Sequence, residues 1–165
     1  KMASKEHAIC SVSVGCSDSF VAIGFVNGNV GIYDPEFTQN VLEFQAHSSL
    51  LLSVTTSKTE PLILTSSEDR TCKLWSLHGV ASLIHTFSGH QDYVITSCFS
   101  NDNKLIFTGS KDETIRGWSK DTGKCLFVIL AHNNTIFRIV HNPEREEFVS
   151  CSGDGLVCEW TYKKN

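Results

Sequence analysis

The chain of 165 residues lacks the features that mark membrane, secreted and nucleic-acid-binding proteins. No apolar run approaches the roughly 20 residues that a membrane-spanning helix needs. The opening residues KMASKEHAIC contain no apolar stretch of the kind found in signal peptides. Basic clusters are missing beyond Lys163-Lys164, and the formal charge is -4. We therefore expect a protein that neither enters a membrane nor contacts nucleic acid directly.

Paired cysteines are absent as well. The chain has seven cysteines, an odd number, and no two of them form a CxxC pair. Most lie among apolar or β-branched neighbours, as small hydrophobic residues in strands do. The seven histidines do not cluster with these thiols at the spacing of zinc ligands. This pattern predicts free thiols, no metal and no cofactor, and it favours a reducing compartment, the cytoplasm or the nucleus.

What the sequence does contain is a repeat with a period of 42 or 43 residues. In three units a histidine is followed 22 residues later by an aspartate, and six residues after that by a tryptophan. A hydroxyl residue precedes each aspartate by four positions. Such constant offsets indicate repeated structural modules. The three sets are His47, Thr65, Asp69 and Trp75; His90, Thr108, Asp112 and Trp118; and His132, Ser150, Asp154 and Trp160.

A weaker copy precedes these three units. Tyr33 takes the tryptophan position, Asn27 the aspartate position and Ile23 the hydroxyl position. Lys5 takes the histidine position, so the first unit keeps the spacing but has lost the polar set. The whole chain is then one segment of four units, at about residues 5–45, 46–88, 89–130 and 131–165.

Each unit shows the signals of short β-strands separated by turns. In the third unit the turn sequences SNDN, KDE and SKDTG separate apolar or β-branched runs at 93–99, 104–110, 114–118 and 124–130. No stretch keeps a 3.6-residue period over the length of a helix. Four strands in a repeat of about 42 residues are typical of a propeller blade. The sequence therefore predicts an all-β chain.

The recurring motifs resemble WD40 repeats. The GH-like and WD-like pairs that carry the resemblance are Ala46-His47, Gly89-His90, Ala131-His132, Tyr33-Asp34, Trp75-Ser76, Trp118-Ser119 and Trp160-Thr161. The resemblance covers nearly the whole chain and implies a WD40 β-propeller of four four-stranded blades. It departs from the family pattern in the first unit and in the second residue of three WD-like pairs. Only TYKKN follows Trp160, so we expect the last blade to lack its outer strand.

The hydroxyl, histidine and aspartate of each unit raise the alternative of a hydrolase, built best on Ser150, His132 and Asp154. A catalytic triad needs one exposed nucleophile and an oxyanion site beside it. Three copies, each closed by a tryptophan, fit this need poorly. The WD40 resemblance implies instead a buried chain of hydrogen bonds from indole to hydroxyl to imidazole to carboxylate. We expect these residues to hold each blade together, and we expect no enzyme.

Function is then expected on the surface, as a scaffold that binds a protein or a peptide. The family pattern places exposed positions three and five residues after each histidine and one residue before each aspartate. Several of these residues are large and apolar, as in interface patches, although the alternative is that some turn inward as core. The positions are Leu50, Leu52, Glu68, Tyr93, Ile95, Lys111, Thr135, Phe137 and Gly153, and in the first unit Ala8, Cys10 and Val26.

The last two units and the basic tail WTYKKN are also similar to the final blades of Groucho/Tup-type transcriptional corepressors. This second similarity implies an alternative within the same class of function. The chain would then recruit transcription factors.

Four blades fall short of the seven that are common in WD40 propellers. Open blade ends expose apolar surface and a strand edge, which proteins seldom leave uncovered. The missing blades come from the same protein, from a second copy that completes an eight-bladed ring, or from another chain. A small closed ring of four blades is the remaining alternative. The initial Lys1, in place of a methionine, favours a fragment of a longer propeller.

Overall fold

The computed structural model describes residues 7–163, so Lys5 and Lys164 lie outside the described residues. One short 3-10 turn, η1 (Cys16–Asp18), accompanies the strands. No helix in the described part is long and apolar enough to cross a membrane. The strands are β1 (Ile9–Val14), β2 (Val21–Phe25), β3 (Asn29–Tyr33), β4 (Asn40–Gln45), β5 (Leu51–Thr56), β6 (Leu62–Ser67), β7 (Thr71–Ser76), β8 (Ser82–Ser88), β9 (Val94–Phe99), β10 (Leu105–Ser110), β11 (Thr114–Ser119), β12 (Cys125–Leu130), β13 (Ile136–His141), β14 (Glu147–Ser152) and β15 (Val157–Thr161).

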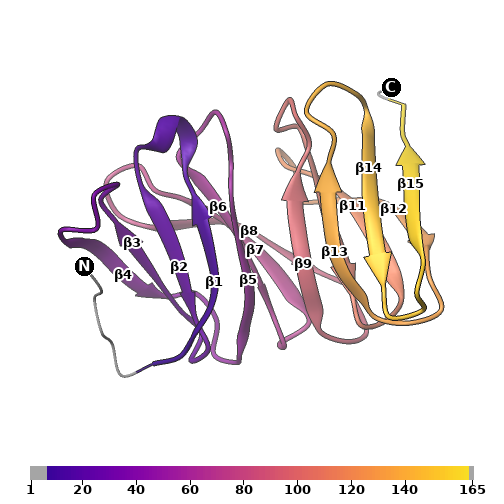
Figure 1. Cartoon of the computed structure of the whole chain (residues 1–165), viewed down its shortest axis with the longest axis horizontal. Coiled ribbons are helices and arrows are strands. Elements are labelled where there is room, and N and C mark those ends of the chain that lie inside the picture. Colours follow the sequence, from indigo (N-terminus) through magenta and orange to yellow (C-terminus); the bar gives the residue numbers. More distant parts are fainter. Residues whose placement is uncertain (1–6, 164–165) are drawn as a thin grey trace.

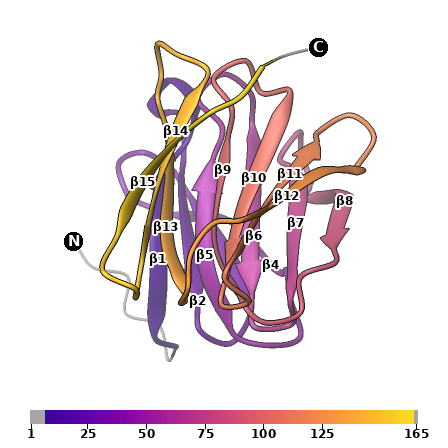
Figure 2. The same ribbon diagram turned by 90° about the vertical axis from the view of Figure 1, so that its right-hand side faces the viewer.

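The strands form four antiparallel sheets, and in each sheet neighbours in sequence are neighbours in space. The sheets are β1-β2-β3-β4, β5-β6-β7-β8, β9-β10-β11-β12 and the three-stranded β13-β14-β15. We call them the first to fourth blades. Figure 1 shows β1, β5, β9 and β13 in this order across the molecule, and Figure 2 shows the strands of the fourth blade beside those of the third. The predicted all-β fold of four blades, the last without its outer strand, is confirmed.

Successive side chains of a strand point to opposite faces of its sheet, so the middle strands contact both neighbouring blades. In β7, Cys72 and Leu74 pack toward the third blade, whereas Trp75 packs toward the first. The strand β6, LILTSS, is buried along its whole length. A strand with this composition is stable only between two layers, and here the adjacent blades provide them.

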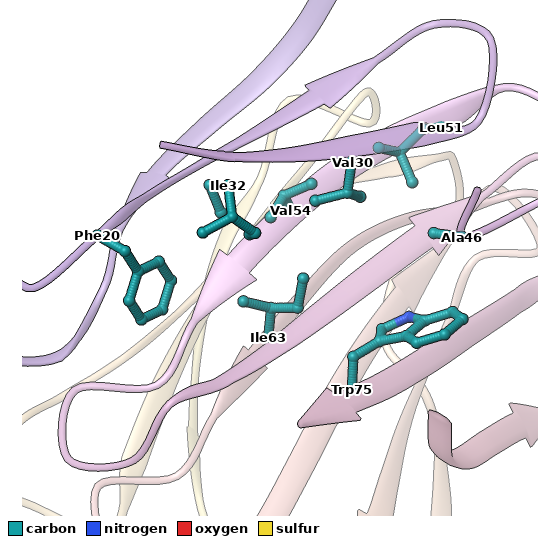
Figure 3. Packing of buried hydrophobic residues seen from close by; sticks show 9 residues of the cluster. Phe20, Val30, Ile32, Ala46, Leu51, Val54, Ile63 and Trp75 are labelled. Atoms are coloured by element: carbon teal, nitrogen blue, oxygen red, sulfur yellow. The ribbon is translucent and has the colours of Figure 1, made fainter. Parts of the chain in front are cut away.

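Three apolar clusters fill the junctions between consecutive blades. Figure 3 shows the first cluster, which joins Val30 and Ile32 of the first blade to Ile63 of the second. In the third cluster the rings of Phe107 and Phe148 lie 4.5 Å apart between centroids. Fully burying one such side chain contributes about 1.5–3 kcal/mol. Packing between blades therefore contributes substantially to stability.

The blades form an open arc. Strand contacts between blades join the first blade to the second, the second to the third and the third to the fourth. The first and fourth blades lie at opposite ends of the molecule (Figure 1). Each end leaves apolar side chains in solvent, with Val12 62% exposed on β1 and Val157 72% exposed on β15. The chain is thus an incomplete propeller and not the small closed ring of four blades.

Candidate functional site

The repeated polar residues of the third blade form one continuous chain of hydrogen bonds. The carboxylate of Asp112 accepts from Nδ1 of His90 at 2.9 Å. The hydroxyl of Thr108 lies 2.8 Å from Nε2 of His90, and it accepts from the indole N–H of Trp118 at 2.8 Å. An indole only donates and a carboxylate only accepts, which fixes the order of the protons when the imidazole is neutral. Thr108 donates to Nε2, and Nδ1 donates to Asp112.

The second and fourth blades repeat this arrangement. Their histidine–aspartate distances are 2.7 and 3.0 Å, their histidine–hydroxyl distances are both 2.8 Å, and their indole–hydroxyl distances are 3.0 and 2.8 Å. We call each set of four a quartet. The two further quartets consist of His47, Thr65, Asp69 and Trp75, and of His132, Ser150, Asp154 and Trp160.

The quartets are poorly placed for hydrolysis. Ser150, the candidate nucleophile, is 1% exposed, and its hydroxyl is engaged by both His132 and Trp160. A nucleophile has to reach its substrate, and this one is enclosed. A network of buried polar groups in which each member has a partner stiffens the structure around it. The geometry therefore favours a structural role for the quartets.

The aspartates of the quartets are held in the charged form. Burial raises the pKa of Asp69, but hydrogen bonds, first of all from His47, outweigh this effect and lower its pKa to about 2. The pKa of Asp112 is lowered against burial in the same way. In the fourth blade the backbone N–H of Asn133 is the largest influence, and the pKa of Asp154 is lowered to about 2. Each carboxylate thus remains an acceptor at neutral pH.

The predicted partner-binding positions come together at one end of each blade, where the loop into the first strand meets the turn after the second strand. One backbone hydrogen bond joins them, from the residue before the aspartate to the carbonyl of the residue three after the histidine. Positions far apart in sequence therefore form one edge in every blade. The pairs and their N···O distances are Glu68 to Leu50, 3.0 Å; Lys111 to Tyr93, 2.9 Å; Gly153 to Thr135, 3.0 Å; and, in the first blade, Val26 to Ala8, 2.8 Å.

A β-bulge near the start of each first strand presents the remaining predicted position. In β5 the pairing skips from Leu51 to Ser53 and leaves Leu52 without an opposite residue. A bulge adds one such residue and changes the direction of its side chain. Sequence reasoning missed the bulges, because one extra residue in a short apolar run leaves no pattern. The residues so placed in the four blades are Cys10, Leu52, Ile95 and Phe137.

None of the eight principal predicted residues is buried, and none belongs to a core cluster. Leu50 is 42% exposed, Phe137 is 57% exposed, and Lys111 is exposed as well. The other five are half-buried. The structure therefore does not fold them inward as core. We call this set the recognition face; it consists of Leu50, Leu52, Glu68, Tyr93, Ile95, Lys111, Thr135 and Phe137.

Tyr93 links the second and third blades on this face. A hydrogen bond with Glu68 raises the pKa of the Tyr93 hydroxyl. The ammonium of Lys111 lies 4.7 Å from the centroid of the Tyr93 ring and 3.5 Å from the carboxylate of Asp92. Ser49 donates to Glu68 at 3.0 Å. The aromatic ring is thus held in place by charged neighbours on both sides.

Two cysteines behave as small apolar side chains. Burial raises the pKa of both Cys72 and Cys98 to about 12, so their thiols stay protonated. All seven cysteines are free in the structure. Within residues 7–163, no three histidine, cysteine, aspartate or glutamate side chains are grouped as metal ligands. The reducing compartment stays a prediction.

Antiparallel meanders of four or three strands arranged as blades, three of them braced by a buried quartet, define a β-propeller repeat protein. The family model for the WD domain, G-beta repeat, matches residues 38–76, 81–119 and 123–161. These segments make up more than half of the chain, which therefore belongs to the WD40 repeat family. The first segment runs from β4 to β7, the second from β8 to β11 and the third from β12 to β15.

The fold also has a counterpart among solved structures. The crystal structure of the computationally designed Ika4 protein matches with a TM-score of 0.85 and 21% sequence identity, over 99% of this chain and 96% of that chain. At this identity the likeness shows the fold alone. No curated protein matches the chain. The similarity to Groucho/Tup-type corepressors stays a prediction.

Proposed function

We propose that the chain is a non-enzymatic scaffold that binds a protein or a peptide on the recognition face. The observation that carries this proposal is the series of bulges, which sets Leu52, Ile95 and Phe137 at the same end of successive blades. WD40 repeat domains commonly act as interaction scaffolds, and this chain carries three matched repeats.

The chemistry of the recognition face suits a partner with apolar anchor residues. Leu50 and Phe137 are exposed and apolar, and the charged side chains of Glu68 and Lys111 lie beside the half-buried ring of Tyr93. Interfaces commonly combine an apolar centre with a polar rim, and aromatic residues supply much of their affinity. We expect one or two apolar side chains of the partner to pack here, flanked by polar contacts.

The quartets lie directly beneath this face and keep it rigid. His47 precedes Leu50 by three residues, and Asp69 follows Glu68 directly, so the bond between His47 and Asp69 ties both segments of the face together. The same connection recurs in the third and fourth blades. A surface held in this way loses little conformational entropy when a partner binds.

A peptide-library pulldown tests this proposal. The wild-type chain is expected to capture a restricted set of peptides, and Tyr93→Ala with Phe137→Ala is expected to lose them while the fold stays intact. Leu130→Ala is the matched control, because Leu130 is 88% exposed on the outer strand β12. Unfolding of the double variant would show that the two side chains are core and would end the proposal, as would equal capture by all three proteins.

The hydrolase alternative has its own test. A serine-reactive fluorophosphonate is expected to leave Ser150 unmodified, because its hydroxyl is enclosed. Labelling of Ser150 in the folded protein would support an enzyme instead. Recruitment of transcription factors is a special case of the scaffold, and it predicts capture of peptides from such factors in the same pulldown.

We propose in addition that a second copy of the chain completes the arc. We call the face of a blade that points toward the following blade in sequence its forward face, and the opposite face its rear face. Each internal junction joins the forward face of one blade to the rear face of the next. One open face of each kind remains, with Ile9, Val12 and Val14 exposed on the first blade and Val140 and Val157 on the fourth. Two copies joined at both ends would form an eight-bladed ring. Native mass spectrometry is expected to show two chains, and the mass of one chain at every concentration would contradict it.

A further inference from the structure

A hollow of about 410 Å³ lies on the inner side of the arc, away from the recognition face. The first strands of all four blades contribute to its lining, from Ser13 on β1 to Arg138 on β13. The loops that follow β5, β9 and β13 supply Lys58, Asn101 and Pro143. The hollow is thus built jointly by the four blades, mostly at the opposite end of these strands from the bulges, and Arg138 is the lining residue that lies next to a bulge. Its volume is within the range of small-molecule sites.

The charges in this hollow are of one sign. Lys58 and Arg138 are the charged side chains that line it, and no aspartate or glutamate is among the lining residues. This contrasts with the chain as a whole, in which 18 acidic residues outnumber 14 lysines and arginines. The His141 ring shares a hydrogen bond with the Tyr162 hydroxyl at 2.7 Å, which positions it. The strong cations of the hollow are therefore Lys58 and Arg138.

Arg138 departs from the repeat. It follows the bulge of β13, and the residues in the same place of the other blades are hydroxyl residues, Ser11, Ser53 and Thr96. Two of these hydroxyls contact the next blade: Ser11 accepts from a backbone N–H of β5 at 3.0 Å, and Thr96 from one of β13 at 3.4 Å. A guanidinium only donates, so Arg138 does not replace this function.

Neither cation of the hollow is neutralised within the described residues. Lys58 and Arg138 are both exposed, and neither takes part in an ion pair there. A concave surface that carries one sign of charge concentrates the field and attracts ligands of opposite charge. A guanidinium matches the geometry of phosphate oxygens with two parallel N–H groups, and an ammonium adds a point charge.

We propose that this hollow binds a small phosphorylated ligand, with Arg138 and Lys58 holding the phosphate oxygens and the Asn101 side chain beside them. Arg138 and Val140 lie on the open face of the fourth blade, because the counterparts of Arg138 contact the next blade. The ligand and the proposed second copy would therefore compete for this face. The ligand enters from the concave side of the arc. The phosphate belongs either to a soluble polyphosphate or to a phosphorylated side chain.

Titration of the amide NMR spectrum with inorganic pyrophosphate tests this site. Saturable shifts are expected at Asn101 and Val140, and Arg138→Ser is expected to weaken binding at least 10-fold. Serine occupies the same register position in two other blades, so this variant is compatible with the fold. Arg138→Lys keeps the charge without the paired N–H groups and is expected to bind with intermediate affinity.

Lys124→Ser is the matched control, because it removes one exposed positive charge that does not line the hollow. It is expected to bind pyrophosphate as the wild type does. Equal weakening by Arg138→Ser and Lys124→Ser would show general charge attraction and overturn the proposal. Absence of saturable shifts in the wild type would overturn it as well. O-phosphoserine provides the second arm: tighter binding of pyrophosphate indicates a soluble polyphosphate, and tighter binding of O-phosphoserine a phosphorylated side chain.

Discussion

The first blade and the three later blades reach the same backbone arrangement by different side chains. The first blade has Ile23 in place of the hydroxyl, Asn27 in place of the aspartate and Tyr33 in place of the tryptophan. It nevertheless forms four strands, a bulge at Cys10 and the turn bond from Val26. A quartet is therefore not required for a blade to form. What the quartet adds is a tie between loop and turn.

A local substitute for that tie exists in the turn of the first blade. The side chain of Asn27 accepts from the N–H of Asn29 at 3.1 Å, as Asp69 accepts from Thr71 at 2.9 Å in the second blade. The carbonyl of Gly28 then accepts from the N–H of His47 at 3.1 Å. The third blade has the equivalent backbone bond, from the N–H of His132 to the carbonyl of Glu113 at 3.4 Å, in addition to its quartet. The first blade thus secures its turn by backbone bonds without a quartet, whereas the third blade has both.

The largest expected effect comes from removing a quartet histidine. His90→Ala leaves the carboxylate of Asp112 and the hydroxyl of Thr108 without their shared partner, at roughly 1–3 kcal/mol for each group. We expect the free energy of unfolding to fall by about 3 kcal/mol in urea denaturation. Asn27→Ala in the first blade is expected to cost less than about 1 kcal/mol. Equal losses in the two variants would remove the distinction between the blades.

A smaller contrast is expected at equivalent turn glycines. Gly28 has φ +91°, and an added Cβ would lie 2.2 Å from the carbonyl oxygen of His47. Gly155 has φ +83° with open space around it. Gly28→Ala is expected to lower the free energy of unfolding by about 2–3 kcal/mol, and Gly155→Ala by about 1 kcal/mol, because only the first adds a steric clash to the strain. Thermal unfolding of both variants measures the difference, and a larger loss at Gly155 would contradict it.

Low pH is expected to destabilise the blades that have a quartet aspartate more than the first blade, which has Asn27 instead. The folded pKa of Asp69 and Asp154 is about 2, below the value of about 3.9 for an unfolded aspartate. Their contribution to stability is therefore complete above pH 4 and is lost as the pH falls from about 4 toward 2. Asn27 does not titrate. Hydrogen exchange at pH 3 is expected to increase more in the turn at Asp69 than in the turn at Asn27, and the reverse order would contradict the assignment.

The smallest expected effect concerns the open ends of the arc. The fourth blade carries Glu159 on its forward face, where the second blade has Leu74, which is 1% exposed. In a ring of two copies this carboxylate would face the apolar rear face of the first blade. Glu159→Leu is expected to tighten self-association several-fold in sedimentation experiments. Glu36→Leu is the control on an exposed loop, and an equal effect of both would show that the fourth-blade face is not part of the contact.

Much of the fold was predictable because the repeat makes its signals redundant. His90, Thr108, Asp112 and Trp118 recur at constant offsets in two further units, and constant offsets survive variation in the strands between them. The positions of the recognition face followed from the family pattern that the WD40 resemblance implies, carried over onto these units. Their binding function stays a prediction.

The remaining features depend on register and on contacts between blades, which a single sequence does not display. The bulge at Leu52 shifts the pairing by one residue without altering the apolar pattern. The interaction between Tyr93 and Glu68 joins two blades, so no offset within one unit predicts it. Arg138 could be noticed in the sequence, because aligning the four units shows hydroxyl residues at the same position in the other three. That comparison requires the structural register to be interpreted.

Exchange of the indole N–H protons of Trp75 and Trp118, followed by NMR, tests the central claim that the quartets are closed structural braces. Both indoles are at most 9% exposed and donate to a buried threonine hydroxyl. Their protons are expected to exchange only through unfolding, at rates that follow the stability of the whole domain. Exchange within about tenfold of the free indole rate would show open sites and contradict the account.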